Sequence, residues 1–126
     1  MQGVPDDLDL PPSQTLAYAQ LLLDDGLAFN AHEVLEAAWK HRPDTERDLW
    51  QGLAQLAVGV THVQRGNVTG AVSLLRRGAD HLAALRAPAP FGIDLAGLLR
   101  FAATLADDLA AGVTIDPQRL CPRLVG

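Results

Sequence analysis

Residues 49–63 read LWQGLAQLAVGVTHV, and this stretch decides which fold the chain can adopt. At 3.6 residues per turn, Gln51, Gln55 and His62 share one narrow arc of a helix with Asp48, which comes just before the stretch. Nearly every other position is apolar or small, and a helix that is apolar almost all round is a buried helix. We therefore expect this segment at the centre of a helical domain, with its polar arc against polar groups of a neighbour.

The sequence on either side predicts further helices, because apolar residues recur there at helical spacing between turn signals. Gly26, the pair Gly66-Asn67 and the proline-rich linker 87–92 separate the segments. The expected spans are 14–25, 27–41, 45–65, 68–86 and 95–111. Three caps are expected: Ser13 on the first helix, Asp94 on the last, and Asp44 or Thr45 on the third, where Thr45-x-x-Asp48 resembles a capping box.

The first four helices contain an internal repeat of 40 positions, because Gly66 follows Gly26 by that interval. The matched positions are Gly26 and Gly66, Ala31 and Ala71, Leu35 and Leu75, Ala38 and Gly78, and His41 and His81. The predicted fold class is all-α: a five-helix bundle of two antiparallel helical hairpins, similar to tetratricopeptide hairpins, closed by a C-terminal helix. The small residues Gly59 and Gly78 are expected where helices approach closely.

Composition limits the class of protein. A chain of 126 residues fits one domain, which we divide into an extended arm (1–12), a helical domain (13–112) and a coil tail (113–126). The net charge of −5 disfavours nucleic acid as a partner. No apolar run is long enough to cross a membrane, and Met1 to Asp9 is too polar for a secretory signal, so a cytoplasmic location is expected. The oligomeric state stays open.

A second polar stripe lies on the helix predicted for residues 27–41. His32, Glu36 and Trp39 follow one another at spacings of four and three residues, which places them on one side of the helix, beside its buried face. Glu33 points about 100° away from His32. Because buried polar groups must satisfy one another, we expect His32 and Glu36 to converge with Gln51, Gln55 and His62.

These two segments resemble a known family. FNAHEVLEAAW (29–39) is similar to the His-Glu-x-x-Glu-x-x-Trp signature of domain-of-unknown-function family 309, and QGLAQLAV (51–58), His62 and Gly66-Asn67 are similar to its second block. The resemblance covers about residues 14–100. It implies a small helical protein of bacteria or archaea, of a kind sometimes labelled a metal-dependent hydrolase. Asn30 departs from the family's usual Glu, which removes one carboxylate from the site.

Two hypotheses about function remain open. In the first, the chain is a structural or binding module: Glu36 accepts hydrogen bonds from His32, Gln51 or the Trp39 indole, and a small molecule or peptide binds on the concave surface of the hairpins. The binding residues are then His32, Glu36, Trp39, Gln51, Gln55 and His62. In the second, His32, Glu36 and His62 hold a divalent transition metal with an open position for water, and Glu33 acts as the general base of a hydrolase.

Overall fold

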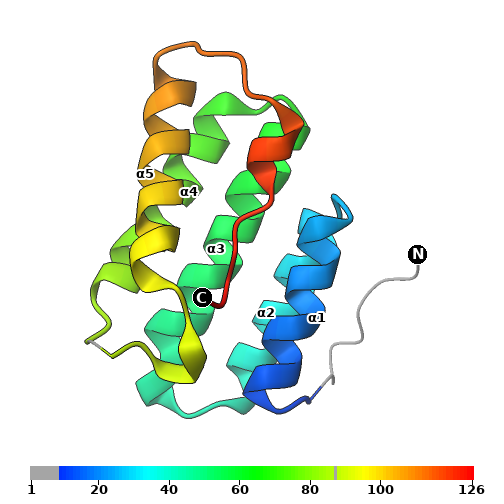
Figure 1. Ribbon diagram of the computed structural model, residues 1–126, viewed down its shortest axis with the longest axis vertical. Helices are drawn as coiled ribbons and strands as arrows, with labels where there is room; N and C mark the ends of the chain where they lie inside the picture. Colours follow the sequence, from blue (N-terminus) through cyan, green and yellow to red (C-terminus); the bar gives the residue numbers. More distant parts are fainter. Residues whose placement is uncertain (1–8, 87) are drawn as a thin grey trace.

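The computed structural model describes residues 9–86 and 88–126, and these form an all-helical bundle (Figure 1). Each helix packs against the next one in the chain, and α3 runs through the middle between α2 and α4. The predicted fold class is confirmed, and each helix begins and ends within three residues of its expected span. The helices are α1 (Pro12–Asp24), α2 (Ala28–His41), α3 (Arg47–Gln64), α4 (Val68–Ala83) and α5 (Leu95–Ala110), with short 3₁₀ turns at Asp44–Glu46, Pro90–Gly92 and Pro117–Leu120.

The α1–α2 and α3–α4 turns have the same backbone geometry, as the repeat predicted. Gly26 and Gly66 both have φ of +76°, a left-handed conformation that glycine adopts without steric cost. In each turn the next residue donates back across the glycine: Leu27 to the Leu22 carbonyl and Asn67 to the His62 carbonyl, both at 2.8 Å. Likeness to tetratricopeptide hairpins stays a prediction.

Two of the predicted helix caps are wrong. Ser13 lies inside α1, which begins with Pro12 after Pro11, because proline is preorganised for the first helical position. The expected capping box at Thr45 and Asp48 does not form, because Asp44–Glu46 is a 3₁₀ turn and α3 starts only at Arg47. The Asp94 cap is confirmed, with its carboxylate accepting from the Gly97 amide at 3.1 Å.

Small residues bring α3 and α4 into close contact. A Cβ atom on Gly59 would lie 2.9 Å from Leu75 Cγ, and one on Gly78 would lie 2.8 Å from Leu56 Cδ2. Both distances are shorter than side-chain carbons tolerate, so only glycine fits at this spacing. The predicted close approaches at Gly59 and Gly78 are confirmed.

The chain end completes the core on one side. After α5 it passes in front of α3, between α1 and α5, as the red segment of Figure 1 shows. Leu120 and Leu124 are buried, and the Leu124 amide donates to Gln20 Oε1 at 2.9 Å. An isolated antiparallel bridge joins Val125 to Ile93, and the described residues form no strand beyond it. Of the predicted arm, residues 1–8 lie outside the described part.

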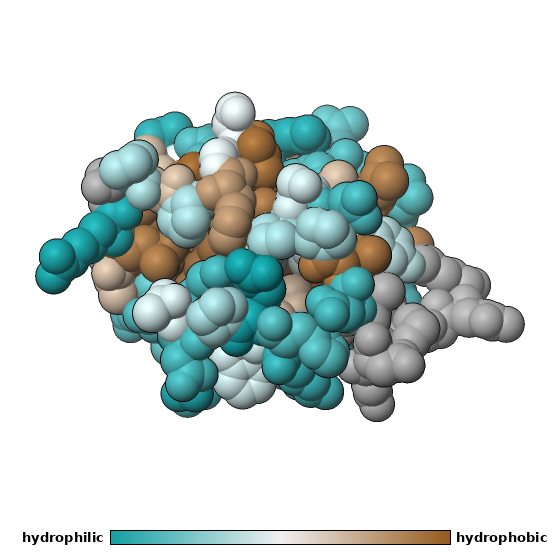
Figure 2. Space-filling view, turned by 90° about the horizontal axis from the view of Figure 1, so that it is seen from below, coloured by the Kyte–Doolittle hydropathy of each residue, from teal (hydrophilic) through white to brown (hydrophobic). Residues whose placement is uncertain are grey.

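The exterior is polar over most of the end that carries the α2–α3 connection. Figure 2 views this end from below and shows hydrophobic residues in several separate areas between hydrophilic ones. Within residues 9–86 and 88–126, no helix has the length and apolar character needed to cross a membrane.

Candidate functional site

A pocket of about 170 Å³ lies between α2 and α3. Helix α2 contributes His32, Glu36 and Trp39, which share one side of the helix because they are four and three residues apart. Five of the six residues predicted to bind are thus brought together, since Gln51 and Gln55 of α3 also line the pocket. The remaining wall residues are Trp50, Ala54 and Val58.

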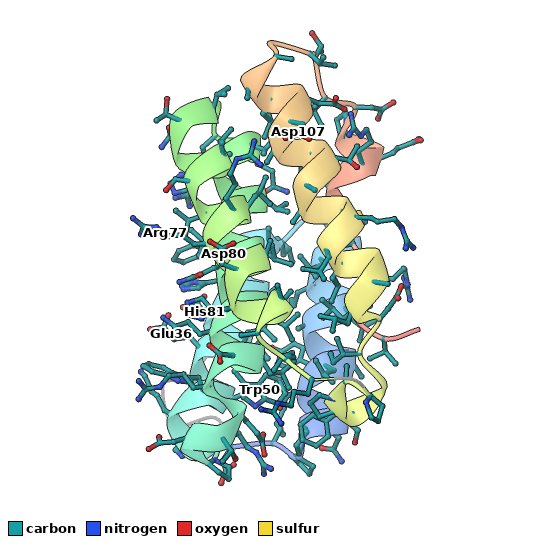
Figure 3. The ribbon with its side chains drawn as sticks, turned by 90° about the vertical axis from the view of Figure 1, so that its left-hand side faces the viewer. Glu36, Trp50, Arg77, Asp80, His81 and Asp107 are labelled. Carbon is teal, nitrogen blue, oxygen red and sulfur yellow. The ribbon has the colours of Figure 1, made fainter. Side chains whose placement is uncertain are left out.

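His32 and Glu36 form the polar edge of this pocket. His32 Nε2 lies 2.7 Å from Glu36 Oε2, one helical turn away, and the two side chains are 21% and 45% exposed. A carboxylate can only accept, so the hydrogen of this bond belongs to Nε2. Glu36 therefore fixes the orientation of the imidazole ring. In Figure 3, Glu36 points away from the bundle along one edge of the molecule.

Two polar atoms of the pocket residues are buried without a partner. They are His32 Nδ1 and Gln55 Oε1, and neither has a hydrogen-bonding group of the described residues within reach. An unsatisfied buried polar atom costs about 1–3 kcal/mol, so native proteins contain few of them. Two such atoms on residues of one pocket mark it as a place with unused hydrogen-bonding capacity.

Trp50 forms a fixed wall of the pocket. Its side chain is fully buried, and its indole N–H donates to Glu46 Oε1 at 2.9 Å. Glu46 also accepts two hydrogen bonds from the Arg42 guanidinium, at 2.8 and 2.9 Å. The hydrogen bonds from Arg42 have the largest effect on the pKa of Glu46, and the bond from Trp50 adds to it. Together they hold this pKa below its ordinary value, although burial acts to raise it. On its other side, Trp50 stacks against Phe91 with ring centroids 6.0 Å apart.

The structure does not bring the three predicted metal ligands together. His62 does not line the pocket with His32 and Glu36, and its Nδ1 lies 3.2 Å from Asn67 Nδ2 at the end of α3. No three His, Cys, Asp or Glu side chains in residues 9–86 and 88–126 lie close enough together to hold a metal ion. The physical reason is axial distance, since seven residues of helix separate His62 from Gln55 by about 10 Å.

Glu33, the predicted general base, lies outside the pocket. It lines a second depression, of about 150 Å³, which His32 and Glu36 also border together with Phe29 and Lys40. Its carboxylate accepts a long hydrogen bond of 3.4 Å from Asn30. Glu33 therefore cannot reach a group held between Trp39 and Gln55 without a change in the course of α2.

One pair of polar residues on the same face was not predicted. His81 Nδ1 of α4 lies 2.8 Å from Asp48 Oδ1 of α3, with the side chains 30% and 46% exposed. In the sequence, His81 stood out only as the position that matches His41 in the 40-residue repeat. Figure 3 shows His81 and Glu36 along the same edge of the molecule. The sequence did show a polar residue on each of two neighbouring helices. It did not show that Asp48 and His81 would pair, because that depends on how the helices pack.

A larger groove of about 540 Å³ lies between α1, the Pro90–Gly92 turn and the chain end. Leu21 and Phe91 line it and are exposed. Its amide residue, Gln20, already bonds to Asp24, Pro122 and Leu124. The polar groups of this groove therefore serve to anchor the chain end, and the α2–α3 pocket remains the better candidate site.

Comparison with known proteins places this site in a family context. YpuF, an uncharacterized protein of Bacillus subtilis (strain 168), is 40% identical over 73 residues, which are 56% of this chain and 42% of the relative. The matched region thus spans less than half of that relative. No solved structure matches the chain significantly. The model of the family described as "Domain of unknown function (DUF309)" matches residues 16–74, which include every residue of the pocket. Through residues 16–74, the chain is thus similar to the DUF309 family.

Proposed function

We propose that this protein is a binding module that takes one small chemical group into the pocket between α2 and α3. The group belongs to a small molecule or to a side chain of a partner peptide. The proposal follows the first of the two hypotheses from the sequence, and it uses the pocket residues His32, Glu36, Trp39, Gln51 and Gln55. The cytoplasmic location expected from the sequence stays a prediction.

The unused hydrogen-bonding capacity of the pocket carries this proposal. If the α2–α3 interface served only stability, apolar residues at positions 32 and 55 would avoid the cost of unsatisfied polar atoms. A bound group that supplies hydrogen bonds would remove that cost. The polar atoms are then understandable as binding groups that reduce the stability of the free protein.

The size of the pocket limits what binds. Sites for drug-sized ligands usually measure about 300–1,000 Å³. The α2–α3 pocket has about 170 Å³, which suits a single side chain or the end group of a small metabolite. Binding is favoured over hydrolysis because the pocket holds one imidazole already bonded to Glu36, and neither His62 nor Glu33 lines it.

The substitution Gln55→Met tests this proposal without any ligand. Methionine keeps the length and the unbranched shape of glutamine but has no amide, so the unsatisfied oxygen disappears. We expect the free energy of unfolding in urea to rise by about 1 kcal/mol. Gln51→Met is the matched control, because Gln51 lines the same pocket and has no such buried atom; its effect should stay within about 0.5 kcal/mol.

A decrease in stability for Gln55→Met would mean that the amide has a structural partner, and the pocket would then be a packing device. A binding measurement completes the test. A screen of small polar fragments against ¹⁵N-labelled protein, followed at the Trp39 indole resonance, should find saturable shifts in the wild type. The same fragments should bind at least several-fold more weakly to Gln55→Met.

A further inference from the structure

The two buried unpartnered atoms of the α2–α3 pocket are both acceptors when the His32 ring is neutral. With Nε2 donating to Glu36, the neutral ring has a lone pair and no hydrogen at Nδ1. The other unpartnered atom, Gln55 Oε1, is also an acceptor. The amide of Gln55 turns about a soft terminal torsion, so a donor inside the pocket can meet its oxygen. A ligand that satisfies these two atoms must therefore donate hydrogen bonds.

The charge near the pocket favours a cation. Glu36 is 45% exposed, and Oε2 is the only one of its oxygens that bonds to another described residue. Hydrogen bonds to an ionised carboxylate are about twice as strong as those between neutral groups. The chain as a whole has a net charge of −5, which attracts cations and repels anions on average.

The aromatic residues favour a cation as well. Indole rings attract positive charge above their faces more strongly than other aromatic side chains do. The Arg47 guanidinium already lies 5.8 Å from the centroid of the Trp39 ring, so a ligand cation must use the part of the ring that Arg47 leaves free. Trp50 contributes a second indole to the same pocket, and Ala54 and Val58 contribute apolar surface that suits methylene groups.

We propose that the ligand is a primary alkylammonium group, with the NH₃⁺ near Glu36 and Gln55 and a short alkyl chain against Ala54 and Val58. This inference rests on the proposed binding function and names its ligand class. A primary ammonium has three N–H donors and no acceptor, which complements the Glu36 carboxylate and the buried oxygen of Gln55. Two sources share this chemistry: a free small amine, or the lysine side chain of a partner protein.

Titration with three probes of similar size tests the ligand class: n-butylammonium, neutral 1-butanol and the anion butanoate. Each is added to ¹⁵N-labelled protein, and the Trp39 indole resonance is followed. We expect n-butylammonium to bind at least about tenfold more tightly than 1-butanol, and butanoate not to saturate. Binding of n-butylammonium should also weaken as salt is added.

Two variants show whether the charge acts locally. Glu36→Gln keeps the shape of the side chain and removes the charge beside the pocket, so n-butylammonium should bind about tenfold more weakly while 1-butanol binds unchanged. Glu33→Gln is the matched control: it makes the same charge change on the same helix but outside the pocket. If both variants weaken binding equally, the charge acts only at long range and the proposed contact with Glu36 is wrong.

Trp39→Leu provides a second variant that does not depend on Glu36. Loss of the indole should weaken n-butylammonium by several-fold and 1-butanol by less, because only the cation gains from the ring. Unfolding in urea verifies that each variant is folded. Equal losses for the two probes would remove the role of the aromatic ring in selecting a cation.

The outcomes separate the ligand class from the binding function. If 1-butanol or butanoate binds as tightly as n-butylammonium, the ammonium class is wrong and the binding module stands. If no probe and no fragment shifts a pocket resonance, and Gln55→Met is not stabilised, both the ammonium class and the binding function are wrong. To distinguish the two sources, the peptide Ac-Ala-Ala-Lys-Ala-Ala-NH₂ is compared with n-butylammonium. Tighter binding of the peptide assigns a lysine of a partner, and tighter binding of n-butylammonium assigns a free amine.

Discussion

Helix α3 meets its two neighbours in different ways. Toward α4 it presents Gly52 and Gly59, and the helices approach so closely that a Cβ on Gly59 would lie 2.9 Å from Leu75 Cγ. Toward α2 it presents Gln51 and Gln55, and a pocket of about 170 Å³ remains between the helices. Gln51 and Gly52 are adjacent in the chain, yet they face different neighbours, because successive residues of a helix point about 100° apart.

The difference shows how one helix can serve stability on one side and binding on the other. Because the glycines have no side chains, leucine side chains of the facing helix pack directly against them, and the α3–α4 interface closes and gains dispersion contacts. The α2–α3 interface has long polar side chains that cannot all be satisfied, and the unsatisfied atoms His32 Nδ1 and Gln55 Oε1 lie there. The closed α3–α4 interface holds α3 in a fixed position, and the pocket at the open α2–α3 interface therefore keeps its place.

The substitution Gly78→Leu should break the closed interface and have the largest effect. The new Cβ would lie 2.8 Å from Leu56 Cδ2 and 2.9 Å from the carbonyl oxygen of Gly52, which is backbone and cannot turn aside. We expect the free energy of unfolding in urea to fall by about 3 kcal/mol through overpacking. Ala83→Leu is the matched control, because Ala83 is exposed at the end of the same helix. Equal effects of the two substitutions would refute the close contact.

The substitution Glu46→Gln should loosen the Trp50 wall of the open interface. Glu46 is 16% exposed and accepts from both Arg42 and Trp50. At pH 7 we expect the free energy of unfolding to fall by about 1 kcal/mol, because the bonds to the ionised carboxylate are lost.

The same variant predicts a pH dependence. The pKa of Glu46 is lower in the folded protein than its ordinary value of 4.5. The ionised group therefore stabilises the fold above its unfolded pKa, and this contribution is lost as the pH falls through the lower, folded pKa. The difference between wild type and Glu46→Gln should be constant near neutral pH and shrink at acidic pH below 4.5. A difference that stays the same across this range would contradict the lowered pKa.

Asp48→Asn should have the smallest effect, although it removes an ion pair between α3 and α4. Asp48 and His81 are 46% and 30% exposed, so water screens their attraction. We expect a loss of about 0.5 kcal/mol that decreases as salt is added. This would show that glycine contacts, and not the ion pair, hold the α3–α4 interface. A loss as large as that of Gly78→Leu would reverse this ranking.

Much of the site followed from helical periodicity alone. His32, Glu36 and Trp39 share one side of α2, and Gln51 and Gln55 share one side of α3, because their spacings leave no other arrangement on a helix. His62 has the right angle on α3 but lies about 10 Å further along the axis than Gln55. A projection down the helix axis hides that distance, and this is why His62 does not line the pocket with the other predicted residues.

The sequence by itself determined the five helices, the two equivalent glycine turns and the residues that face inward. These are local properties, since they depend on residues a few positions apart. The tertiary structure alone decided that Asp48 meets His81, that Glu46 joins Arg42 to Trp50, and that the α2–α3 interface stays open. Each of these depends on how far one helix lies from another and at what height, and that relation is set by packing among residues far apart in the chain.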